Sequence, residues 1–428
     1  MSANVLLFVN AAQTVTCAGP ARARRGSEMG NAEIRTDVAV LVEHDTITQV
    51  GPEHALRQGA AHATVVDCGG GVLTPGFNDS HTHAIFGRAR YEEQELRATG
   101  VSYMEIAKRG GGIHASVRDL RTRSEDELYA LAVPRLRALA SSGVTTVEVK
   151  SGYGLSLEDE LKTLRVVRRL ADALPMRIVP TWLGAHEIPL DYRERVNGRR
   201  AYLDLLINDM LPVVARERLA QFADVFCEPG VFTVDESREI LSAARAAGLG
   251  IKMHADELTA GGAAELAGEL HATSADHLAA VSDAGIAALS AAGTVATLLP
   301  GTMLFLGKTS HAPARRLIDA GVAVALATDF NPGTSPTTNF PLILTLGVSQ
   351  LRLSVAEVLV AATVNGAAAL GLARSVGQLA PGFSADLVLW DVSDARELPY
   401  WYGAGRCRAS WARGKPCHVH DLALTSRS

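Results

Sequence analysis

The sequence predicts an α/β protein: a (β/α)8 TIM-like barrel with a small β-sandwich domain built from both termini. Eight short β-branched or leucine-rich runs alternate with helical segments through the middle of the 428 residues, a pattern typical of βαβ units around a parallel sheet. The strand-like alternation of the N-terminus returns near the C-terminus. With 47% hydrophobic and 20% charged residues, the chain can bury one large core.

The N-terminal segment, residues 1–75, is expected to be β structure. An apolar run at 5–9 predicts a buried first strand. Val38, Val40 and Val42 then share one face of an alternating segment, which is the period of a strand. A turn at residues 44–45 completes a predicted hairpin over 36–50.

The middle segment, residues 76–372, is expected to form the barrel. Eight such units close into a barrel rather than an open sheet, and the active site of a barrel lies where the carboxyl ends of its strands meet the following loops. The predicted strands are 72–77, 144–149, 177–183, 225–227, 250–253, 272–275, 295–299 and 322–327. The predicted helices include 125–140, 157–173, 234–247, 282–291, 312–320 and 355–370.

The C-terminal segment, residues 373–428, returns to β structure. A glycine-containing turn at 377–382 leads into a predicted strand at 385–390. Because the termini of compact folds commonly lie close together, we expect residues 1–75 and 373–428 to form one domain. Two separate β modules are the alternative.

Charge and cysteine content narrow the classes of function. The 41 basic against 46 acidic residues give a net charge of -5, so no global positive field favours a nucleic-acid partner. The basic cluster Arg22, Arg24 and Arg25 is expected to be a solvated loop.

Five cysteines without C-x-x-C spacing favour reduced thiols and a cytoplasmic location. No apolar run reaches the roughly 18 residues of a membrane span, so no membrane partner is expected.

Metal-ligand residue types follow the predicted strands. His81 and His83 come after the first strand with i, i+2 spacing, which directs both imidazoles to one side. Five more candidates stand at or just past later strands: His186, Glu228, His254, His277 and Asp329. Because the carboxyl ends of barrel strands meet at one face, we expect these side chains to converge.

These residue types predict hydrolysis at a divalent ion. His81, His83, His254 and Asp329 supply four donors, and such an ion lowers the pKa of its water so that hydroxide can attack a carbonyl. Asp329 is also expected to accept the proton of the water and pass it to a leaving nitrogen.

Two further residues are expected to act on the substrate. His277 would polarise the carbonyl oxygen, and Glu257 would contact or protonate the substrate. We expect one ion, because Lys150, a candidate bridging group, is placed across the barrel. A second ion bridged by Glu228, with His254 and His277, is the alternative.

Several segments resemble the imidazolonepropionases of the amidohydrolase superfamily, and the resemblance covers nearly the whole chain. The His-Thr-His segment at 81–83 is a superfamily feature. The segments Lys-Ser-Gly-Tyr-Gly at 150–154 and Asp-Phe-Asn-Pro-Gly-Thr-Ser-Pro at 329–336 are much more specific. Further matching segments lie at 75–77, 93–97, 108–113, 148–155, 183–186, 254–257 and 274–277.

The resemblance implies hydrolysis of the cyclic amide of 4-imidazolone-5-propanoate to N-formimino-L-glutamate, the third step of histidine degradation, with one zinc or iron ion. A guanidinium grips a carboxylate through two parallel hydrogen bonds, which suits Arg90 and the propionate of this small-molecule substrate. The implied substrate contacts are Arg90, Tyr153, His186, Glu257, Asn331, Gly333 and Thr334. A homodimer is expected only because it is the commonest oligomer.

Two other functions remain open from the sequence. A related amidohydrolase could act on another nitrogen heterocycle as a deaminase, and would then release ammonia. A barrel without catalysis would bind partners only. Ser80 and Glu187 depart from the family pattern. The position of Glu257 is Glu or Gln among relatives, so we expect Glu257 to be a substrate contact first.

Overall fold

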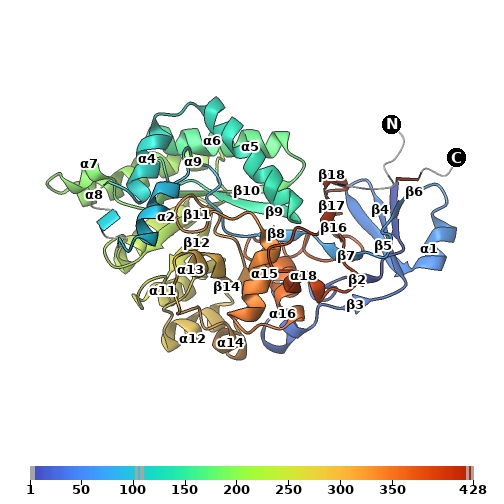
Figure 1. Cartoon of the computed structure of the whole chain (residues 1–428). Coiled ribbons are helices and arrows are strands. Elements are labelled where there is room, and N and C mark those ends of the chain that lie inside the picture. The colour runs from blue at the N-terminus through green and yellow to red at the C-terminus, as the bar shows by residue number, and fades with distance from the viewer. Residues whose placement is uncertain (1–4, 102–104, 107–109, 421–423, 426–428) are drawn as a thin grey trace.

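The computed structural model describes residues 5–101, 105–106, 110–420 and 424–425. It confirms the predicted architecture: an eight-stranded parallel barrel lies beside two smaller sheets to which both ends of the chain contribute (Figure 1). No helix among the described residues is both long and apolar enough to cross a membrane. The five cysteines are unpaired.

The barrel strands are neighbours in chain order, and every adjacent pair is parallel. Their alternating inward side chains form the layers of the barrel interior. The strands are β8 (Phe77–Asp79), β9 (Val144–Lys150), β10 (Arg177–Ala185), β11 (Phe222–Cys227), β12 (Gly250–Ala255), β13 (Ser274–His277), β14 (Val295–Leu298) and β15 (Val324–Leu326).

Backbone hydrogen bonds just beyond β8 and β15 close the ring. The N–H of Asp329 donates to the carbonyl of His81 at 3.0 Å, and the N–H of His83 donates to that of Phe330 at 2.9 Å. Asp79 adds a side-chain link, because its carboxylate accepts from the N–H and hydroxyl of Thr328 at 3.0 and 2.6 Å. Closure therefore places the predicted ligands of the first and last strands side by side.

Helices on the outside of the barrel start at capping residues. Ser124, Ser156 and Thr233 each accept a backbone N–H from the first turn of the helix that follows, which satisfies an otherwise unpaired donor. The helices after the strands are α2 (Tyr91–Ala98), α4 (Ile113–Arg121), α5 (Glu125–Ser141), α6 (Leu157–Ala173), α7 (Leu190–Arg193), α8 (Gly198–Asp204), the π-helical η2 (Leu205–Met210), α9 (Leu211–Arg216), α10 (Val234–Ala246), α11 (Ala263–Glu269), α12 (Asp283–Ala292), α13 (Pro300–Phe305), α14 (Ala314–Asp319), α15 (Phe340–Ser349), α16 (Val355–Val360), the π-helical η3 (Ala361–Asn365) and α17 (Gly366–Ala368).

The two small sheets each combine strands from both ends of the chain. One has the order β19–β6–β1–β4–β5 and the other β18–β17–β16–β7–β2–β3. Phe8 of the first sheet meets Trp411 of the second edge to face, with ring centroids 4.9 Å apart. The strands are β1 (Val5–Val9), β2 (Gln13–Val15), β3 (Ile34–Arg35), β4 (Val38–Glu43), β5 (Thr46–Pro52), β6 (Thr64–Asp67), β7 (Val72–Pro75), β16 (Leu387–Trp390), β17 (Cys407–Ala412), β18 (Lys415–Val419) and β19 (Leu424–Thr425), with short helices η1 (Gly26–Gly30), α1 (Glu53–Gly59) and α18 (Glu397–Tyr400).

The expectation of one barrel strand over 72–77 is wrong. Residues 72–75 form β7, which pairs with β16 in a small sheet, whereas β8 begins the barrel at Phe77. Gly76 lies at the crossing, where its N–H bonds to Asp386 of the small domain. A Cβ there would lie 1.9 Å from the hydroxyl oxygen of Thr145, so only glycine permits the two sheets to approach this closely.

The basic cluster at residues 22–25 is not simply a solvated loop, since Arg24 is buried. Its backbone N–H donates to Oδ1 of Asn365 at 2.7 Å, and Nδ2 of Asn365 donates back to its carbonyl at 3.0 Å. The guanidinium donates to the carbonyl of Cys17 at 3.1 Å. This segment is therefore fixed against the π-helical η3.

Candidate active site

The carboxyl ends of the barrel strands open into a cavity of about 640 Å³. Gly333 is not among the residues that line this cavity, and His81 is completely buried next to it. The structure brings the other predicted site residues together around the cavity. They are His83, Arg90, Tyr153, His186, His254, Glu257, His277, Asp329, Asn331 and Thr334.

The four predicted metal ligands lie close together in overlapping groups. Nε2 of His81 and Nε2 of His83 each lie 3.6 Å from Oδ1 of Asp329. The rings of His81 and His254 have centroids 4.5 Å apart. Four sets of ligand atoms among the described residues lie within 4.8 Å of one another: His81–His83–Asp329, His81–His254–His277, His83–His186–His254 and His81–Glu148–Asp276.

The ligand atoms themselves indicate a missing partner. Nε2 of His81 and Nε2 of His254 are buried and have no hydrogen-bond partner within the described part of the chain. Buried polar atoms of native proteins are usually satisfied. A cation with imidazole and carboxylate ligands would satisfy them, so this donor set fits a metal ion.

Two buried carboxylates orient two of these histidines. Nδ1 of His81 lies 2.7 Å from Oδ2 of Asp276, and Nδ1 of His254 lies 3.0 Å from Oδ2 of Asp224. An ionised carboxylate only accepts hydrogen bonds, so it favours the tautomer with the proton on Nδ1. In His81 the lone pair is then on Nε2, the ring atom that has no hydrogen-bond partner among the described residues.

Two buried lysines balance the charge of these carboxylates. Nζ of Lys150 lies 2.7 Å from Asp224 and 2.8 Å from Glu148, and Nζ of Lys252 lies 2.9 Å from Glu148. Asp276 is within 3.9 Å of both ammonium groups. Burial lowers the pKa of Lys150, but Asp224 and Glu148 outweigh this effect and raise it. Lys150 is therefore not across the barrel as expected: it lies beneath the histidines, and its ammonium is held in ion pairs.

The pKa values of the site histidines are shifted in two directions. Burial lowers the pKa of His81, His83 and His277 well below the ordinary value, and the positive charge of nearby groups lowers it further. These rings are neutral near pH 7 and can act as ligands or hydrogen-bond donors. For His254, burial also lowers the pKa, but the adjacent Asp224 carboxylate more than compensates and the pKa rises.

Asp329 has one oxygen held and the other facing the histidines. The hydroxyl of Thr302 donates to Oδ2 at 2.6 Å, whereas Oδ1 faces His81 and His83. Burial raises the pKa of Asp329 to about 6, so the carboxylate is mostly ionised at pH 7 and remains a competent proton acceptor. Its φ of +52° is unusual for a residue with a side chain.

Glu257 and His277 face each other at the wall of the cavity. Nε2 of His277 lies 3.7 Å from Oε2 of Glu257. Burial raises the pKa of Glu257 to about 8, and the negative charge of Asp329 contributes to the rise. Glu257 is therefore mainly a neutral acid at pH 7. His277 has a φ of +79°, and strained backbone of this kind is concentrated at functional sites.

Glu228 holds a loop instead of sharing an ion. Its two carboxylate oxygens accept from the N–H of Leu258 at 3.2 Å and from the hydroxyl of Thr259 at 2.6 Å. It belongs to none of the ligand clusters found among the described residues. The geometry thus gives no support to a second ion at Glu228.

Gly333 lies between two guanidinium groups, that of Arg90 just before α2 and that of Arg97 in the last turn of α2. A Cβ on Gly333 would lie 2.0 Å from Nη2 of Arg90, and both Nη atoms of Arg97 donate to its carbonyl at 3.3 Å. Glu93 accompanies Arg90, with Oε1 3.2 Å from Nε. The absent side chain of Gly333 therefore leaves the space in which Arg90 reaches the cavity.

Asn331 shapes the same loop through its side-chain amide. Oδ1 accepts from the N–H groups of Gly333 and Thr334, both at 2.8 Å, and Nδ2 donates to the carbonyl of Asp329 at 2.7 Å. The N–H of Gly333 is thus already used within the loop. Asn331 and Thr334 line the cavity, and Gly333 contributes through the loop geometry.

Aromatic rings line another part of the cavity wall. The ring of His186 stacks on that of His83, with centroids 5.0 Å apart and planes 15° apart, and Tyr153 lies 5.5 Å from His186. Nδ1 of His186 lies 3.0 Å from the carbonyl of Gly152. Burial lowers the pKa of His186 to about 3, so the ring is neutral and suits a planar ligand.

The sequence reasoning missed the residues beneath the ligands. Spacing carried a usable signal, because Lys252 precedes His254 by two residues, and Glu148 precedes Lys150 by two, so each pair lies on one face of its strand. Nothing local indicated which charges would pair across strands. The missed residues include Glu148, Asp224, Lys252, Asp276 and Thr302, together with Arg97 and Lys308 at the cavity.

Comparisons with known proteins identify relatives of the chain. A family model described as "Amidohydrolase family" matches residues 104–418. The imidazolonepropionase of Symbiobacterium thermophilum is 48% identical over 414 residues, which are 96% of each chain. That of Geobacillus kaustophilus is 46% identical over 96% of this chain and 97% of its own.

A zinc-bound adenosine deaminase from Xanthomonas campestris has a TM-score of 0.71 at 18% identity, covering 97% of this chain and 93% of its own. A 5-methylcytosine deaminase from Klebsiella pneumoniae has a TM-score of 0.71 at 19% identity, covering 98% and 100%. At this identity the structural likeness concerns the fold alone.

Proposed function

The chain belongs to the amidohydrolase family and, within it, to the imidazolonepropionases, and on this premise we propose that it hydrolyses the cyclic amide of 4-imidazolone-5-propanoate to N-formimino-L-glutamate. This is the third step of histidine degradation. The observation that carries the proposal is the convergence of His81, His83, His254 and Asp329 beside a cavity that Arg90 lines.

One ion per subunit is proposed at the four ligands, and it is zinc or iron. Imidazole and carboxylate donors suit both metals. When bound, the ion would supply Lewis acidity that polarises the ring carbonyl and the attacking water. The buried Nε2 atoms of His81 and His254 without partners support this assignment.

The protein side chains then move the protons. The Asp329 carboxylate takes a proton from a water molecule as the oxygen of that water attacks the ring carbonyl carbon, and it gives this proton to the ring nitrogen when the C–N bond breaks. His277, neutral at pH 7, donates a hydrogen bond to the carbonyl oxygen. Glu257 contacts the substrate as a neutral acid. Its Oε2 also lies 3.7 Å from Nε2 of His277.

Substrate recognition uses the wall of the cavity. Arg90 binds the propionate, since a guanidinium offers paired donors to a carboxylate. The flat rings of Tyr153 and His186 flank the imidazolone, whereas Asn331, Gly333 and Thr334 provide the loop on the other side.

The decisive assay follows the loss of the imidazolone chromophore after addition of purified protein. We expect turnover that a chelator abolishes and that added zinc or iron restores. Arg90→Gln should raise KM for the propionate substrate by about 100-fold, because a charge-assisted bidentate contact is lost, with a smaller change in kcat. No chromophore loss in the metal-loaded protein would reject the proposal.

Ammonia release separates this reaction from that of a deaminase. Opening the imidazolone ring by hydrolysis leaves both nitrogens in the product, whereas a deaminase expels one. A coupled ammonia assay on the same sample should therefore stay at its blank value while the chromophore disappears.

We further propose a cytoplasmic homodimer whose barrel spans 76–372 and whose small domain combines 1–75 and 373–428. The interlaced strands of the two small sheets support this division. Light scattering on the purified chain tests the dimer.

A further inference from the structure

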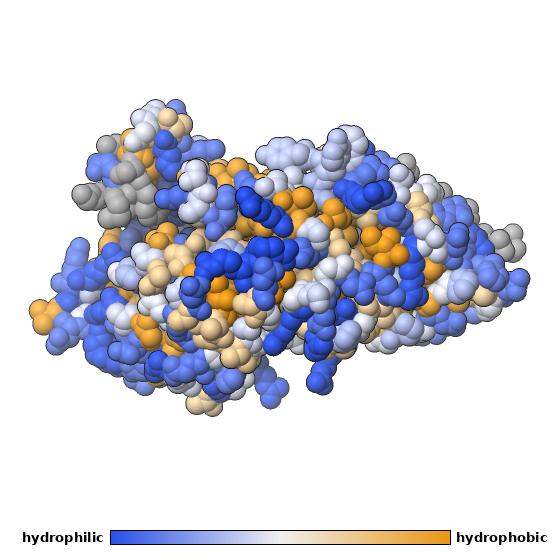
Figure 2. Space-filling view, turned by 90° about the horizontal axis from the view of Figure 1, so that it is seen from below, coloured by the Kyte–Doolittle hydropathy of each residue, from blue (hydrophilic) through white to orange (hydrophobic). Residues whose placement is uncertain are grey.

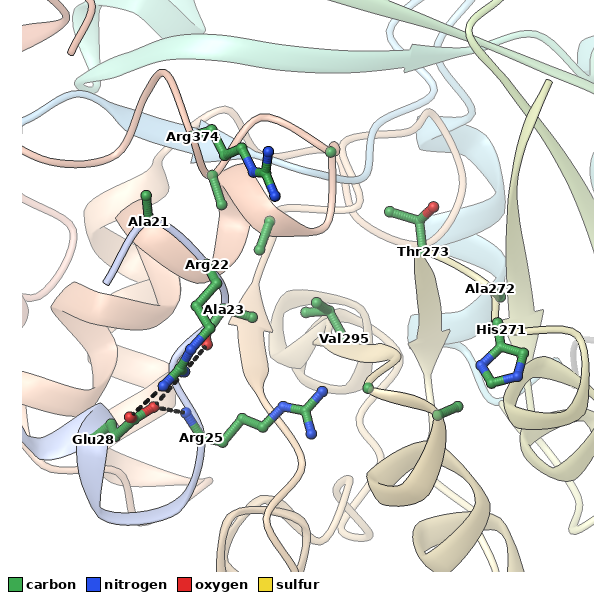
Figure 3. A pocket seen from close by; sticks show the side chains of 15 residues that line it. Ala21, Arg22, Ala23, Arg25, Glu28, His271, Ala272, Thr273, Val295 and Arg374 are labelled. Carbon is green, nitrogen blue, oxygen red and sulfur yellow. Dashed lines mark hydrogen bonds and ion pairs between the residues drawn. The ribbon is translucent and has the colours of Figure 1, made fainter. Parts of the chain in front are cut away.

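A second cavity, of about 870 Å³, lies at the opposite end of the barrel. Its wall includes His271 to Thr273, which lead into β13, and Gly293 and Val295 at the start of β14. The N-terminal loop at 21–28 and the segment 371–374 close its other side (Figure 3). Because the candidate active site is at the carboxyl ends of these strands, the two cavities are separate.

Arg25 is held in position at this cavity. The backbone N–H and carbonyl of its neighbour Arg24 are both hydrogen-bonded to the side-chain amide of Asn365. The side chain passes over Gly293, where a Cβ would lie 2.1 Å from Nη2, and Nη1 lies 3.5 Å from the carbonyl of Ser290. This carbonyl belongs to the last turn of α12, the end of a helix that favours a cation.

The cavity has an excess of positive charge. Arg22 is neutralised by Glu28, with Nη1 and Nη2 each 2.8 Å from a carboxylate oxygen. The guanidinium groups of Arg25 and Arg374 have no carboxylate partner within the described ranges, although the backbone N–H of Arg25 donates to Glu28 at 3.2 Å. Figure 3 shows the two side chains entering the cavity from two different segments, with His271 on the opposite side. Two unneutralised guanidiniums that face one cavity favour a ligand with two negative groups.

The floor of the cavity is apolar and made of small side chains. Ala23, Ala272, Ala292, Val295, Ala368 and Ala373 line it. Small residues leave the space open, and their methyl groups suit hydrocarbon rather than a hydrated inorganic ion. The ligand that fits both features carries two carboxylates on a short aliphatic chain.

We propose that this cavity is a binding site for a small aliphatic dicarboxylate, gripped at one end by Arg25 and at the other by Arg374, with its carbon chain on the alanine floor. The site does not depend on the proposed reaction, since it shares no residue with the catalytic cavity.

Isothermal titration of the purified full-length chain with glutarate tests the proposal. At low ionic strength, where charge pairing is least screened, glutarate should bind at least fivefold more tightly than acetate or inorganic phosphate. The double variant Arg25→Ala/Arg374→Ala should weaken glutarate binding at least tenfold. Arg137→Ala is the matched control, because it removes an exposed arginine of α5 and should leave the affinity unchanged.

Two further measurements keep the test decisive. Arg374→Gln alters only an exposed side chain, so it should fold normally and still weaken glutarate binding severalfold. Arg90→Gln in the catalytic cavity should leave glutarate binding at this site intact. Binding that is lost in Arg90→Gln but retained in the double variant would place glutarate in the catalytic cavity and overturn the proposal, as would phosphate binding that equals or exceeds that of glutarate.

Discussion

Nδ1 of His81 lies 2.7 Å from Oδ2 of Asp276, and both side chains are completely buried. The two residues are 195 positions apart in the sequence. His81 follows β8, whereas Asp276 belongs to β13. Asp276 is in turn fixed by the hydroxyl of Ser274 at 2.6 Å. The candidate metal ligand is therefore oriented by a carboxylate that is itself held rigidly.

Replacing this carboxylate should weaken metal binding. In Asp276→Asn the amide no longer fixes the proton on Nδ1 of His81, and outer partners of this kind contribute about 10–100-fold in metal affinity. Competition with a chromophoric chelator measures the change. Asp283→Asn, at an exposed position, serves as the control. An affinity equal to that of the unaltered protein would show that Asp276 does not position His81.

Loss of Lys150 should destabilise the fold. Lys150→Met leaves Glu148 and Asp224 buried with one cation fewer, and removing one partner of a buried ion pair costs about 3–5 kcal/mol. Urea denaturation gives the free energy of unfolding. Lys415→Met, which alters an exposed lysine, should change it little. A cost below about 1 kcal/mol would contradict a structural role for this ion pair.

Glu257 predicts a pH dependence with a defined sign. Burial raises its pKa from 4.5 to about 8, so between these values the folded protein binds a proton that the unfolded chain releases. The contribution of this proton to the free energy of unfolding is complete below pH 4.5 and is lost as pH rises through about 8. Glu257→Gln keeps a neutral side chain, so metal-free Glu257→Gln should lose less stability between pH 6 and pH 9 than the metal-free parent protein.

The same substitution separates binding from proton transfer. If Glu257 acts as a substrate contact, Glu257→Gln should keep kcat and KM within about threefold at pH 7, because glutamine mimics the neutral acid. Steady-state rates across the pH range provide the measurement. A fall in kcat of more than about 100-fold would instead make Glu257 an essential acid.

Adding a methyl group at Gly333 should impair substrate binding. In Gly333→Ala the new Cβ meets Nη2 of Arg90 at 2.0 Å, so the guanidinium must leave its place at the cavity. We expect KM to rise at least tenfold, because about one charge-assisted hydrogen bond to the substrate is lost. The effect on kcat should be smaller. Gly405→Ala has no neighbour within 4 Å and should behave like the parent protein in the same assay.

Local patterns predicted most of the fold. Helix α6 begins and ends at the predicted residues 157 and 173, because Ser156 caps it and an apolar face is repeated with helical period. The prediction of one barrel strand over 72–77 failed for a physical reason. A short apolar run is equally suited to β7 in the small sheet and to β8 in the barrel. The pairing of β7 with β16 and of β8 with β9 determines where one strand ends, and Gly76 between them permits the close approach to Thr145.

The sequence by itself determined the order of strands and helices and the residue types at the strand ends, since both follow from the periodicity of neighbouring residues along the chain. Only the tertiary structure decided that Asp276 orients His81, that Lys150 pairs with Asp224, and that Arg90 occupies the space beside Gly333. These pairings depend on strand register and on barrel closure, which bring together side chains separated by up to 243 positions, as Arg90 and Gly333 are. Local periodicity contains no information about which residues so far apart in the sequence meet in the fold.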